Sequence, residues 1–358
     1  MSDLFYGGAE SQIRNIISAL CSKGIDVFIA KENIETNFIT EQEKEFLSKN
    51  HIFENRIYNL HNLNKDFVKG VFFYLKNIAH CIKTINKINI VFVYDKFGIL
   101  AIPFFFFLKI KVLYSERNSG EIFKKHWLYR FFFRLFKPTV TCNSNVAKEI
   151  LEKSIGFSVK KINNIVDIPQ SNRARKNKDA SVLNILVSAR LSPEKNQLVV
   201  VDAFEALNIG KKIVINFAGN IQDESYAALV REKIRKNSNV NISYNFLGYV
   251  KDVDSLYASC DCVILPSLTE GTPNVVLECF ARRVPVLASD IPQNRVLFQD
   301  KSFLFNPSSA KSLIHTFENF LATKEIQLQN NLDENFSFVQ SEFGRGNANE
   351  YVKLMESY

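Results

Sequence analysis

Two glutamates separated by seven residues, Glu270 and Glu278, are spaced so that both could contact one ligand. Glu270 follows the short apolar run Cys262–Leu265, which predicts a buried parallel strand. Glu278 lies inside the helix predicted next, with Thr272 as its cap and Pro273 as its first residue. The N–H groups and positive dipole end at the start of a helix attract phosphate. A diphosphate bound there would let the two acids reach hydroxyl groups at its opposite ends, which suits a nucleotide sugar.

A basic loop offers the complementary charge. Arg190 and Lys195 follow the first predicted strand of the second half, at the carboxyl end where parallel sheets bind ligands. A forked guanidinium and a mobile ammonium suit a diphosphate leaving group, whose negative charge grows as it departs. Taken alone, an ordinary basic turn and two solvated surface glutamates would explain these residues equally well. Their conjunction in one predicted sheet favours a binding site.

These two segments resemble a known family. The segment from Glu270 to Glu278 resembles the E-x7-E motif of the retaining GT-B glycosyltransferases of family 4. The segment Ser188-Ala-Arg190-Leu-Ser-Pro-Glu-Lys195-Asn resembles the phosphate-binding loop of the same family. The resemblance covers nearly the whole chain and is most specific from about residue 183 to residue 290. It implies an α/β fold of GT-B type, with two doubly wound Rossmann-like domains facing across a cleft.

The resemblance also implies roles for individual residues. Catalysis would depend on Glu270, Arg190 and Lys195, with Glu270 contacting the hydroxyl groups of the donor hexose and Glu278 binding the ribose. The remaining donor-binding positions implied by the resemblance are Val250, Gly271, Thr272, Pro273, Asn274, Val275, Gly7 and Gly8. No DxD pattern or histidine cluster predicts a metal site, and the resemblance implies transfer without a metal or other cofactor. Arg190 and Lys195 would then act in place of a metal cation.

The acceptor side of the resemblance falls in the first half of the chain. Glu116, Arg117 and Asn118 directly follow a predicted buried strand, and an ordinary polar loop is the alternative interpretation. Asp95 stands near the place where many members of the family carry a histidine. The implied acceptor is a glycan or a lipid-linked glycan.

Strand–helix alternation predicts two doubly wound domains. We expect an N-terminal acceptor-side domain over 1–170, a polar and basic linker over 171–180, and a C-terminal nucleotide-sugar-binding domain over 181–340. Residues 341–358 would form a C-terminal helix that packs back toward the N-terminal domain. Predicted strands cover 25–30, 56–60, 88–94, 111–115, 139–143, 159–163, 183–189, 213–218, 242–247, 262–265, 285–288 and 303–305. Predicted helices cover 10–23, 67–86, 97–109, 122–136, 145–153, 197–207, 224–236, 253–259, 274–281, 310–322 and 347–356.

The beginning of the chain is short for this fold. Leu4, Phe5 and Tyr6 precede the Gly7–Gly8 turn, where members of the resembled family carry a full apolar strand. That strand is central in a sheet of order 3-2-1-4-5, and buried backbone groups left without partners cost about 1–3 kcal/mol each. We therefore expect the natural start to lie upstream, or the first half to fold poorly.

The composition of the 358-residue chain, with 46% hydrophobic and 23% charged residues, is typical of globular proteins with two domains. The six cysteines are scattered and show no zinc or disulfide pattern, which suits a reduced cytoplasmic protein. No signal peptide is recognisable. The longest near-apolar run, Phe97–Leu108, is too short to span a bilayer.

Positive charge is concentrated in the first half. Residues 1–170 contain 24 Lys and Arg against 16 Asp and Glu, so the whole net charge of +8 resides there. Residues 104–137 contain eight basic and two acidic side chains interleaved with phenylalanines, Trp127 and Tyr129. This pattern predicts peripheral contact with the anionic inner face of the cytoplasmic membrane, and a core helix with solvated charges is the alternative. No nucleic-acid-binding motif accompanies the charge, so nucleic acid is not expected as a partner.

The residues and the resemblance together predict an enzyme that moves a hexose from a nucleoside diphosphate sugar, UDP-linked, to a lipid-linked or polysaccharide acceptor in bacterial surface glycan synthesis. Retention of configuration is implied by the resemblance alone. Two rivals stay open. One is a GT-B epimerase acting on the nucleotide sugar, which would need acid–base residues that the sequence does not reveal. The other is a non-catalytic nucleotide-sugar-binding protein.

Overall fold

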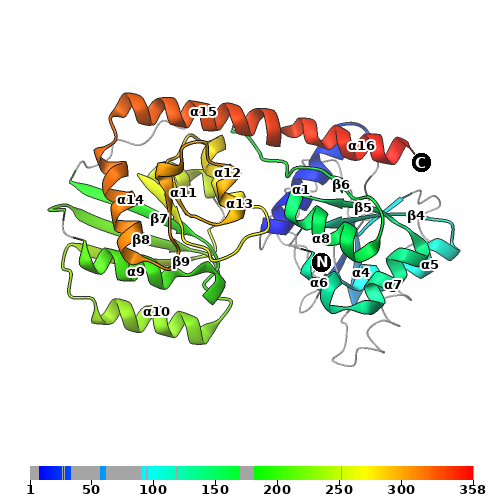
Figure 1. Cartoon of the computed structure of the whole chain (residues 1–358), viewed down its shortest axis with the longest axis horizontal. Coiled ribbons are helices and arrows are strands. Elements are labelled where there is room, and N and C mark those ends of the chain that lie inside the picture. The colour runs from blue at the N-terminus through cyan, green and yellow to red at the C-terminus, as the bar shows by residue number, and fades with distance from the viewer. Residues whose placement is uncertain are drawn as a thin grey trace. The chain divides into compact units, whose positions relative to one another are not determined.

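The chain was analysed as a computed structural model that describes residues 8–25, 27, 29–33, 57–61, 90–93, 96–117, 120–169, 181–207, 209–250 and 252–357. It divides into two compact units (Figure 1). Unit 1 comprises Met1–Ile165 together with Arg345–Tyr358, and unit 2 comprises Val166–Gly344. The predicted linker over 171–180, the short segment before Gly8 and the predicted helix over 67–86 lie outside the described residues.

Unit 2 is built on one six-stranded parallel sheet with the strand order β12-β11-β10-β7-β8-β9. Its strands are β7 Val182–Ser188, β8 Lys212–Ala218, β9 Ile242–Gly248, β10 Cys262–Leu265, β11 Val286–Ser289 and β12 Leu304–Phe305. The first strand, β7, lies in the middle, with β8 on one side and β10 on the other. This is the doubly wound order, in which the connections change direction between β7 and β10. All four residues of β10 and of β11 are buried, as expected for strands covered on both faces.

Helices cover both faces of this sheet, and Figure 1 shows α9 and α10 on the side opposite α12 and α15. The bounds are α9 Gln197–Ala206, α10 Glu224–Lys236, α11 Val253–Ser259, α12 Asn274–Ala281, α13 Pro292–Arg295, α14 Ala310–Ala322 and α15 Glu325–Phe343. Short 3-10 turns lie at η2 Pro193–Lys195 and η3 Lys301–Phe303. The sequence prediction missed α13 and the 19-residue α15. The latter packs on α12 through Leu328, Leu332, Val339 and Phe343, which recur at helical spacing.

Unit 1 contains the parallel sheet β3-β4-β5-β6 and the separate parallel pair β1-β2. Their bounds are β1 Ile29–Asn33, β2 Ile57–His61, β3 Ile90–Val93, β4 Lys111–Glu116, β5 Thr139–Cys142 and β6 Lys160–Lys161. The predicted strand over 25–30 begins later, because pairing with β2 starts at Ile29. Along β4, Val112 and Tyr114 face one apolar cluster and Leu113 faces another, so this strand is buried on both faces.

The helices of unit 1 differ from the prediction mainly where two long predicted helices are each divided into two. They are α1 Gly8–Cys21, α4 Lys96–Leu100, α5 Ile102–Phe107, α6 Glu121–Lys125, α7 Trp127–Phe136, α8 Asn145–Ile155 and α16 Ala348–Glu356, with the 3-10 turn η4 Arg345–Asn347. The predicted helix over 97–109 is interrupted at Ala101, because Pro103 lacks the N–H that would continue the ladder. The predicted helix over 122–136 is interrupted at His126, whose backbone is extended (φ −115°, ψ 101°). Within the described helices, none combines the length and apolar character needed to cross a membrane.

The last helix belongs to unit 1. Helix α16 packs on α1, and its Tyr351 is almost fully buried with Leu113 of β4 in a shared apolar cluster. Glu350 forms an ion pair with Lys160 of β6 at 2.9 Å. Asn347 donates a hydrogen bond to the carbonyl of Asn164 at 3.3 Å. Residues at the end of the chain therefore complete the core of the unit that contains its beginning.

The turn after β8 depends on Gly219. Its φ of +151° is rare for a residue with a side chain, and a Cβ built there would lie 2.2 Å from the carbonyl oxygen of Ala189. The same Cβ would lie 2.9 Å from the backbone nitrogen of Arg190. Both atoms belong to the loop after β7, so glycine is what permits the two loops to approach each other closely.

We expect Gly219→Ala to lower the free energy of unfolding of unit 2 by roughly 2–4 kcal/mol, because backbone must move to admit the methyl group. Gly210→Ala is the matched control, since Gly210 also has a positive φ (+67°) but has open space around the added Cβ. Its cost should be about 1–2 kcal/mol. Chemical denaturation followed by circular dichroism measures both, and equal losses would show that the close approach at Gly219 has no energetic weight.

Candidate functional site

The carboxyl ends of β7 and β10 lie side by side at the switch point of unit 2, where the connections between strands change direction. The two strands are direct neighbours, with Cys262 opposite Ile185 and Val263 opposite Leu186. In doubly wound sheets the connections from such a pair leave toward opposite faces, and the opening between them is where ligands bind. The loop after β7 carries Arg190 and Lys195, and the loop after β10 carries Glu270.

Lys195 and Glu270 form an ion pair across this switch point. The Lys195 Nζ lies 2.6 Å from the Glu270 Oε1, and the two side chains are 16% and 12% exposed. Both charged groups are therefore largely removed from water. In such surroundings a charge without its partner would be costly in free energy. The structure thus brings together a cation and a carboxylate that the sequence predicted separately for phosphate and sugar.

Backbone contacts on either side of Lys195 hold the same two loops together. The N–H of Leu268 donates to the carbonyl of Glu194 at 2.8 Å. The side-chain amide of Asn196, whose φ is +54°, donates to the carbonyls of Pro307 at 2.8 Å and Pro266 at 3.3 Å. Three successive residues of the loop after β7 therefore contact the loop after β10, which fixes the position from which Lys195 extends.

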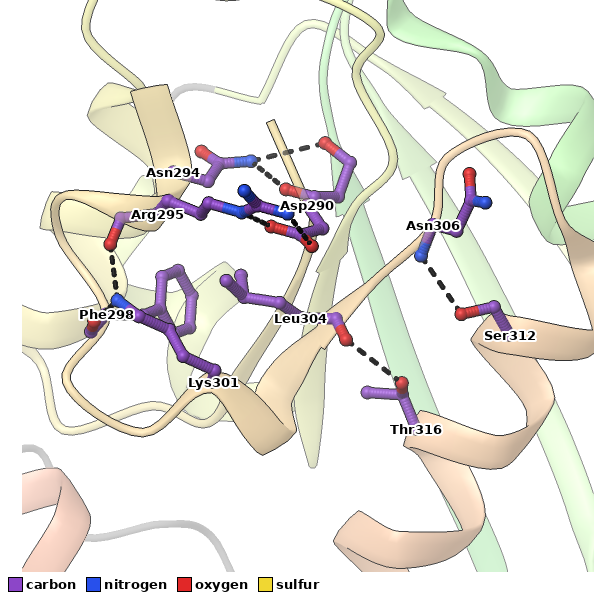
Figure 2. A network of polar contacts seen from close by, with 10 residues as sticks. Asp290, Asn294, Arg295, Phe298, Lys301, Leu304, Asn306, Ser312 and Thr316 are labelled. Carbon is purple, nitrogen blue, oxygen red and sulfur yellow. Dashed lines mark hydrogen bonds and ion pairs between the residues drawn. The ribbon is translucent and has the colours of Figure 1, made fainter. Parts of the chain in front are cut away.

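A buried polar chain supports the loop after β10 from the side of β11. The Ser289 hydroxyl donates to the carbonyl of Ser267 at 2.6 Å, and Asn294 donates to the Ser289 carbonyl at 2.7 Å. All three residues are fully buried. Figure 2 shows Asn294 on α13 beside the ion pair of Arg295 with Asp290. The Arg295 guanidinium holds the pKa of Asp290 below its ordinary value.

The same close-up shows how the adjoining end of β12 is fixed (Figure 2). The Thr316 hydroxyl donates to the carbonyl of Leu304 at 3.4 Å, and the N–H of Asn306 donates to the Ser312 hydroxyl at 3.0 Å. Helix α14 thereby holds the strand that borders β11. Hydrogen bonds therefore connect the strand ends and loops at the carboxyl edge of the sheet to neighbouring loops and helices.

Helix α12 begins where the second loop ends. Its first residue is Asn274, and Pro273 occupies the cap position without a side-chain cap hydrogen bond, so the predicted cap at Thr272 is wrong by one residue. The Pro273 carbonyl accepts from the N–H groups of Val276 at 3.0 Å and Leu277 at 3.3 Å. The earlier N–H groups of an α-helix have no acceptor within the helix. Gly271, Thr272, Asn274 and Val275 are all partly exposed, whereas Pro273 is buried.

Glu278 is held by a tyrosine that sequence reasoning missed. The Tyr257 hydroxyl, at the end of a fully buried side chain of α11, donates to the Glu278 Oε2 at 2.8 Å. Burial and the negative charge of Glu278 raise the pKa of Tyr257 well above its ordinary value, so the phenol keeps its proton and donates. No periodicity links residues 257 and 278, and the contact becomes visible once α11 and α12 are packed together.

Arg282 completes this arrangement. Its guanidinium lies 5.3 Å from the centre of the Tyr257 ring and 2.8 Å from the Asp254 carboxylate. Burial alone would lower the pKa of Arg282, but the charges of Glu278 and Asp254 outweigh burial and raise it. A signal for Arg282 exists in the sequence, because it follows Glu278 by four residues on one helix face.

The other predicted donor residues of unit 2 lie at the same edge of the sheet. Arg190 is exposed, and its carbonyl accepts a hydrogen bond from Gln197 at 2.9 Å. Val250 follows β9 and Gly248, is partly buried and packs on the core of unit 2. Within the described part of the chain, Gln197 Oε1 at the start of α9 and Ser267 Oγ in the loop after β10 are buried side-chain oxygens without a hydrogen-bond partner. Such atoms are rare in native proteins and are commonly satisfied by water or a ligand.

Three of the predicted site residues of unit 1, Gly8, Glu116 and Arg117, lie within the described residues. Gly8 is the first residue of α1, whereas Gly7, Asp95 and Asn118 lie outside the described residues. Glu116 and Arg117 are buried, at 4% and 7% exposure.

Both side chains have partners inside unit 1. Glu116 accepts a hydrogen bond from Tyr114 at 3.0 Å. Arg117 donates to Asn164 at 3.0 Å and to the Tyr351 hydroxyl of α16. Arg117 thus connects β4 to the last helix, and contact of either residue with an acceptor stays a prediction. In the ranges that the structure describes, no three His, Cys, Asp or Glu side chains are grouped to hold a metal ion.

Comparisons with known proteins identify similar glycosyltransferases. Residues 169–336 match the family model of the glycosyl transferases group 1. The chain is 24% identical over 332 residues to an uncharacterized glycosyltransferase of Haemophilus influenzae, which covers 90% of this chain and 89% of the relative. Over 203 residues it is 26% identical to the N-acetylgalactosamine-N,N'-diacetylbacillosaminyl-diphospho-undecaprenol 4-alpha-N-acetylgalactosaminyltransferase of Campylobacter jejuni, which covers 54% of this chain and 52% of the relative.

The whole chain also resembles solved structures. It superposes on Anabaena Alr3699/HepE in complex with UDP and glucose with a TM-score of 0.76 at 18% identity, covering 98% of this chain and 96% of the other. This likeness concerns the fold, which is α/β with parallel sheets in both units. The chain therefore has the predicted GT-B fold, and the matches of family and fold together support a glycosyltransferase.

Proposed function

We propose that this chain is a retaining hexosyltransferase of family 4 that moves a hexose from a UDP-linked sugar to a lipid-linked or polysaccharide acceptor in bacterial surface glycan synthesis. The observation that carries the proposal is the ion pair of Lys195 with Glu270 at the switch point of unit 2. It places a cation for phosphate and a carboxylate for sugar hydroxyl groups within one hydrogen bond of each other, beside the start of α12.

The chemistry assigned to these residues follows from charge. When the bond between the sugar C1 and the diphosphate oxygen breaks, the electron pair stays on the diphosphate. Lys195 and Arg190 would stabilise that charge, and N–H groups of residues 271–275 would add dipoles aimed at it. A bound phosphate would compete for Lys195, which leaves Glu270 available to accept from a hexose hydroxyl. Because these cations supply the positive charge, we propose that transfer needs neither a metal nor another cofactor.

Retention of configuration is part of the proposal. The acceptor hydroxyl would attack C1 from the face that the diphosphate leaves, and its proton would pass to a leaving phosphate oxygen. Glu278, fixed by Tyr257, would bind the ribose of the nucleotide. Gly7, Gly8 and Val250 would complete the donor side, and Asp95, Glu116, Arg117 and Asn118 would lie on the acceptor side.

The names of similar proteins support the substrate classes. The solved Anabaena protein was crystallised with UDP and glucose, and the Campylobacter jejuni relative is named for a sugar acceptor linked to diphospho-undecaprenol. From these we propose a nucleoside diphosphate sugar as donor and a glycan or lipid-linked glycan as acceptor. We place the activity in the cytoplasm, at the inner face of the membrane. The matches to transferases favour this function over an epimerase or a non-catalytic binding protein.

A panel of nucleotide sugars tests the proposal. One member should raise the melting temperature of the protein, and the same member should lose its sugar to an acceptor extract with unchanged anomeric configuration. Activity should persist in a chelator of divalent cations. Epimerised donor without transfer would point to the rival enzyme, binding without turnover would point to a binding protein, and no protection by any nucleotide would refute the site.

We expect Lys195→Ala to lower kcat more than nucleotide affinity, because the charge that develops on the leaving group loses its partner. Glu278→Ala should instead weaken nucleotide binding by about 1.5–3 kcal/mol, the usual contribution of hydrogen bonds to a charged group. Steady-state kinetics and calorimetric titration with the nucleotide separate the two effects.

The control for the lysine variant is Lys233→Ala in the same unit. Lys233 pairs with Asp202 at 2.7 Å but lies partly exposed on α10, away from the candidate site, so its loss should change neither constant. A cycle of Lys195→Ala, Glu270→Ala and the double variant isolates the coupling of the pair. Native kinetics and affinity in both Lys195→Ala and Glu278→Ala would mean that this edge of unit 2 is not the donor site.

We expect Tyr257→Phe to raise the dissociation constant for the nucleotide about fivefold with kcat nearly unchanged, because one hydrogen bond that positions Glu278 is lost. The matched control is Tyr244→Phe, which removes a hydroxyl that accepts from Asn237 at 3.0 Å elsewhere in unit 2. Should both variants weaken nucleotide binding equally, Tyr257 would have a merely structural role.

A further inference from the structure

The helices α5 and α7 of unit 1 present large apolar side chains to solvent. Phe107 is 76% exposed, Trp127 67% and Leu135 58%. The set that we call the aromatic surface consists of Phe106, Phe107, Leu108, Trp127, Phe131 and Leu135. Folded chains seldom leave so many large apolar groups together in water unless something covers them.

The aromatic surface is continuous over the two helices. Helix α5 packs on α7, and the ring of Phe136 lies 5.1 Å from the ring of Phe106 and 6.3 Å from that of Phe107. The rings of Trp127 and Phe131 lie 6.4 Å apart. The side chains form one patch rather than isolated exposed residues.

The exposed apolar residues of α7 are not the ones that pack this helix on the core of unit 1. Tyr129 and Phe133 are buried in the core of unit 1 and form the inward-facing apolar stripe of α7. Trp127, Phe131 and Leu135 recur every four residues and form a second apolar stripe that points outward. A helix packed against a core on one side normally carries polar residues on the other.

Exposed lysines adjoin the aromatic surface in the chain, close to Leu108, Trp127 and Phe136. Lys109, Lys125 and Lys137 are exposed and form no side-chain hydrogen bond or ion pair in the part of the chain that the structure describes. Beside α7, a hollow of about 690 Å³ is lined by Lys124, Arg130, Arg134 and Lys153, with Glu149 as its acidic residue. Glu149 is already paired with Lys153 at 2.7 Å, so the lining keeps a positive excess.

We propose that the aromatic surface docks reversibly on an anionic lipid bilayer. Tryptophan and phenylalanine side chains insert at the boundary between headgroups and acyl chains, while lysines attract anionic headgroups with about 1 kcal/mol each near the surface. The basic hollow would receive a headgroup phosphate. This inference rests on unit 1 alone and does not depend on the proposed transfer reaction.

A second copy of this chain is the main alternative occupant, and its charges oppose it. A symmetric dimer through this surface would bring two copies of Lys109, Lys125 and Lys137 into one interface, with no acidic side chain of the aromatic surface to offset them. Like charges brought together at an interface are unfavourable. An anionic bilayer instead complements both the apolar centre and the basic surroundings.

The sequence contains one tryptophan, and it lies in this surface, so intrinsic fluorescence reports directly on docking. With vesicles that contain phosphatidylglycerol, the emission of Trp127 should shift to shorter wavelength at low salt and return as salt is raised. Vesicles of phosphatidylcholine alone should bind at least about tenfold more weakly.

Two variants that retain Trp127 test the surface. Phe107→Ser with Phe131→Ser, and Lys125→Glu with Lys137→Glu, should each lower vesicle partitioning about tenfold or more. The controls are Ile326→Ser, at a 72% exposed position of α15, and Lys211→Glu with Lys311→Glu, which change the same chemistry on unit 2. The far-UV circular dichroism spectrum and the thermal unfolding transition, measured on every variant, show whether unit 1 is still folded, so that lost docking is not mistaken for lost folding.

Several results would overturn the proposal. One is an emission that does not respond to anionic vesicles at low salt, and another is binding that is indifferent to salt and to headgroup charge. Equal loss of partitioning in the variants and their controls would also do so. A shift that appears without lipid as the protein concentration rises, together with sedimentation as a dimer, would assign the surface to a second copy.

Discussion

The ion pair between Lys195 and Glu270 joins two loops that lie 75 residues apart in the chain and makes them one site. Two charges held at 16% and 12% exposure cost several kcal/mol to desolvate, so the pair persists because the loops that carry it are fixed independently. Glu194 and Asn196 fix one loop, and Ser289 with Asn294 fixes the other. The desolvation of Lys195 is therefore complete before a donor arrives, which is the condition under which a cation acts most strongly on a developing charge.

The grouping of Arg190, Lys195 and Glu270 could be predicted from the sequence because the sheet topology alone brings their loops together. Once β7 and β10 are recognised as parallel strands on either side of the switch point, Arg190, Lys195 and Glu270 must share an edge. The topology of the sheet does not fix side-chain contacts between helices in the same way. The bond of Tyr257 to Glu278 depends on how α11 and α12 pack, and that of Arg117 to Tyr351 depends on where α16 returns.

Some predicted helix boundaries were wrong for local reasons. Pro103 divides one predicted helix, and the extended His126 divides another. Helix α15 was not predicted because no strand follows it, so strand–helix alternation gave no signal for it. The spacing of Leu328, Leu332 and Val339 is nevertheless helical. For the basic aromatic segment the two interpretations were not exclusive. Phe133 belongs to the core, and Phe131 two residues earlier faces water.

Because α16 completes the core of unit 1, the order in which the two units can mature differs from the order in which they are translated. Residues 8–165 leave the ribosome first, but Tyr351 and Ala348, which cover β4 and α1, emerge after the whole of unit 2. Domains usually fold from the N-terminus onward during synthesis. Here the nascent first unit keeps one apolar face uncovered while the second unit, continuous in sequence, can close around its own core. The interval between the two is when this chain is most exposed to aggregation and most in need of a chaperone.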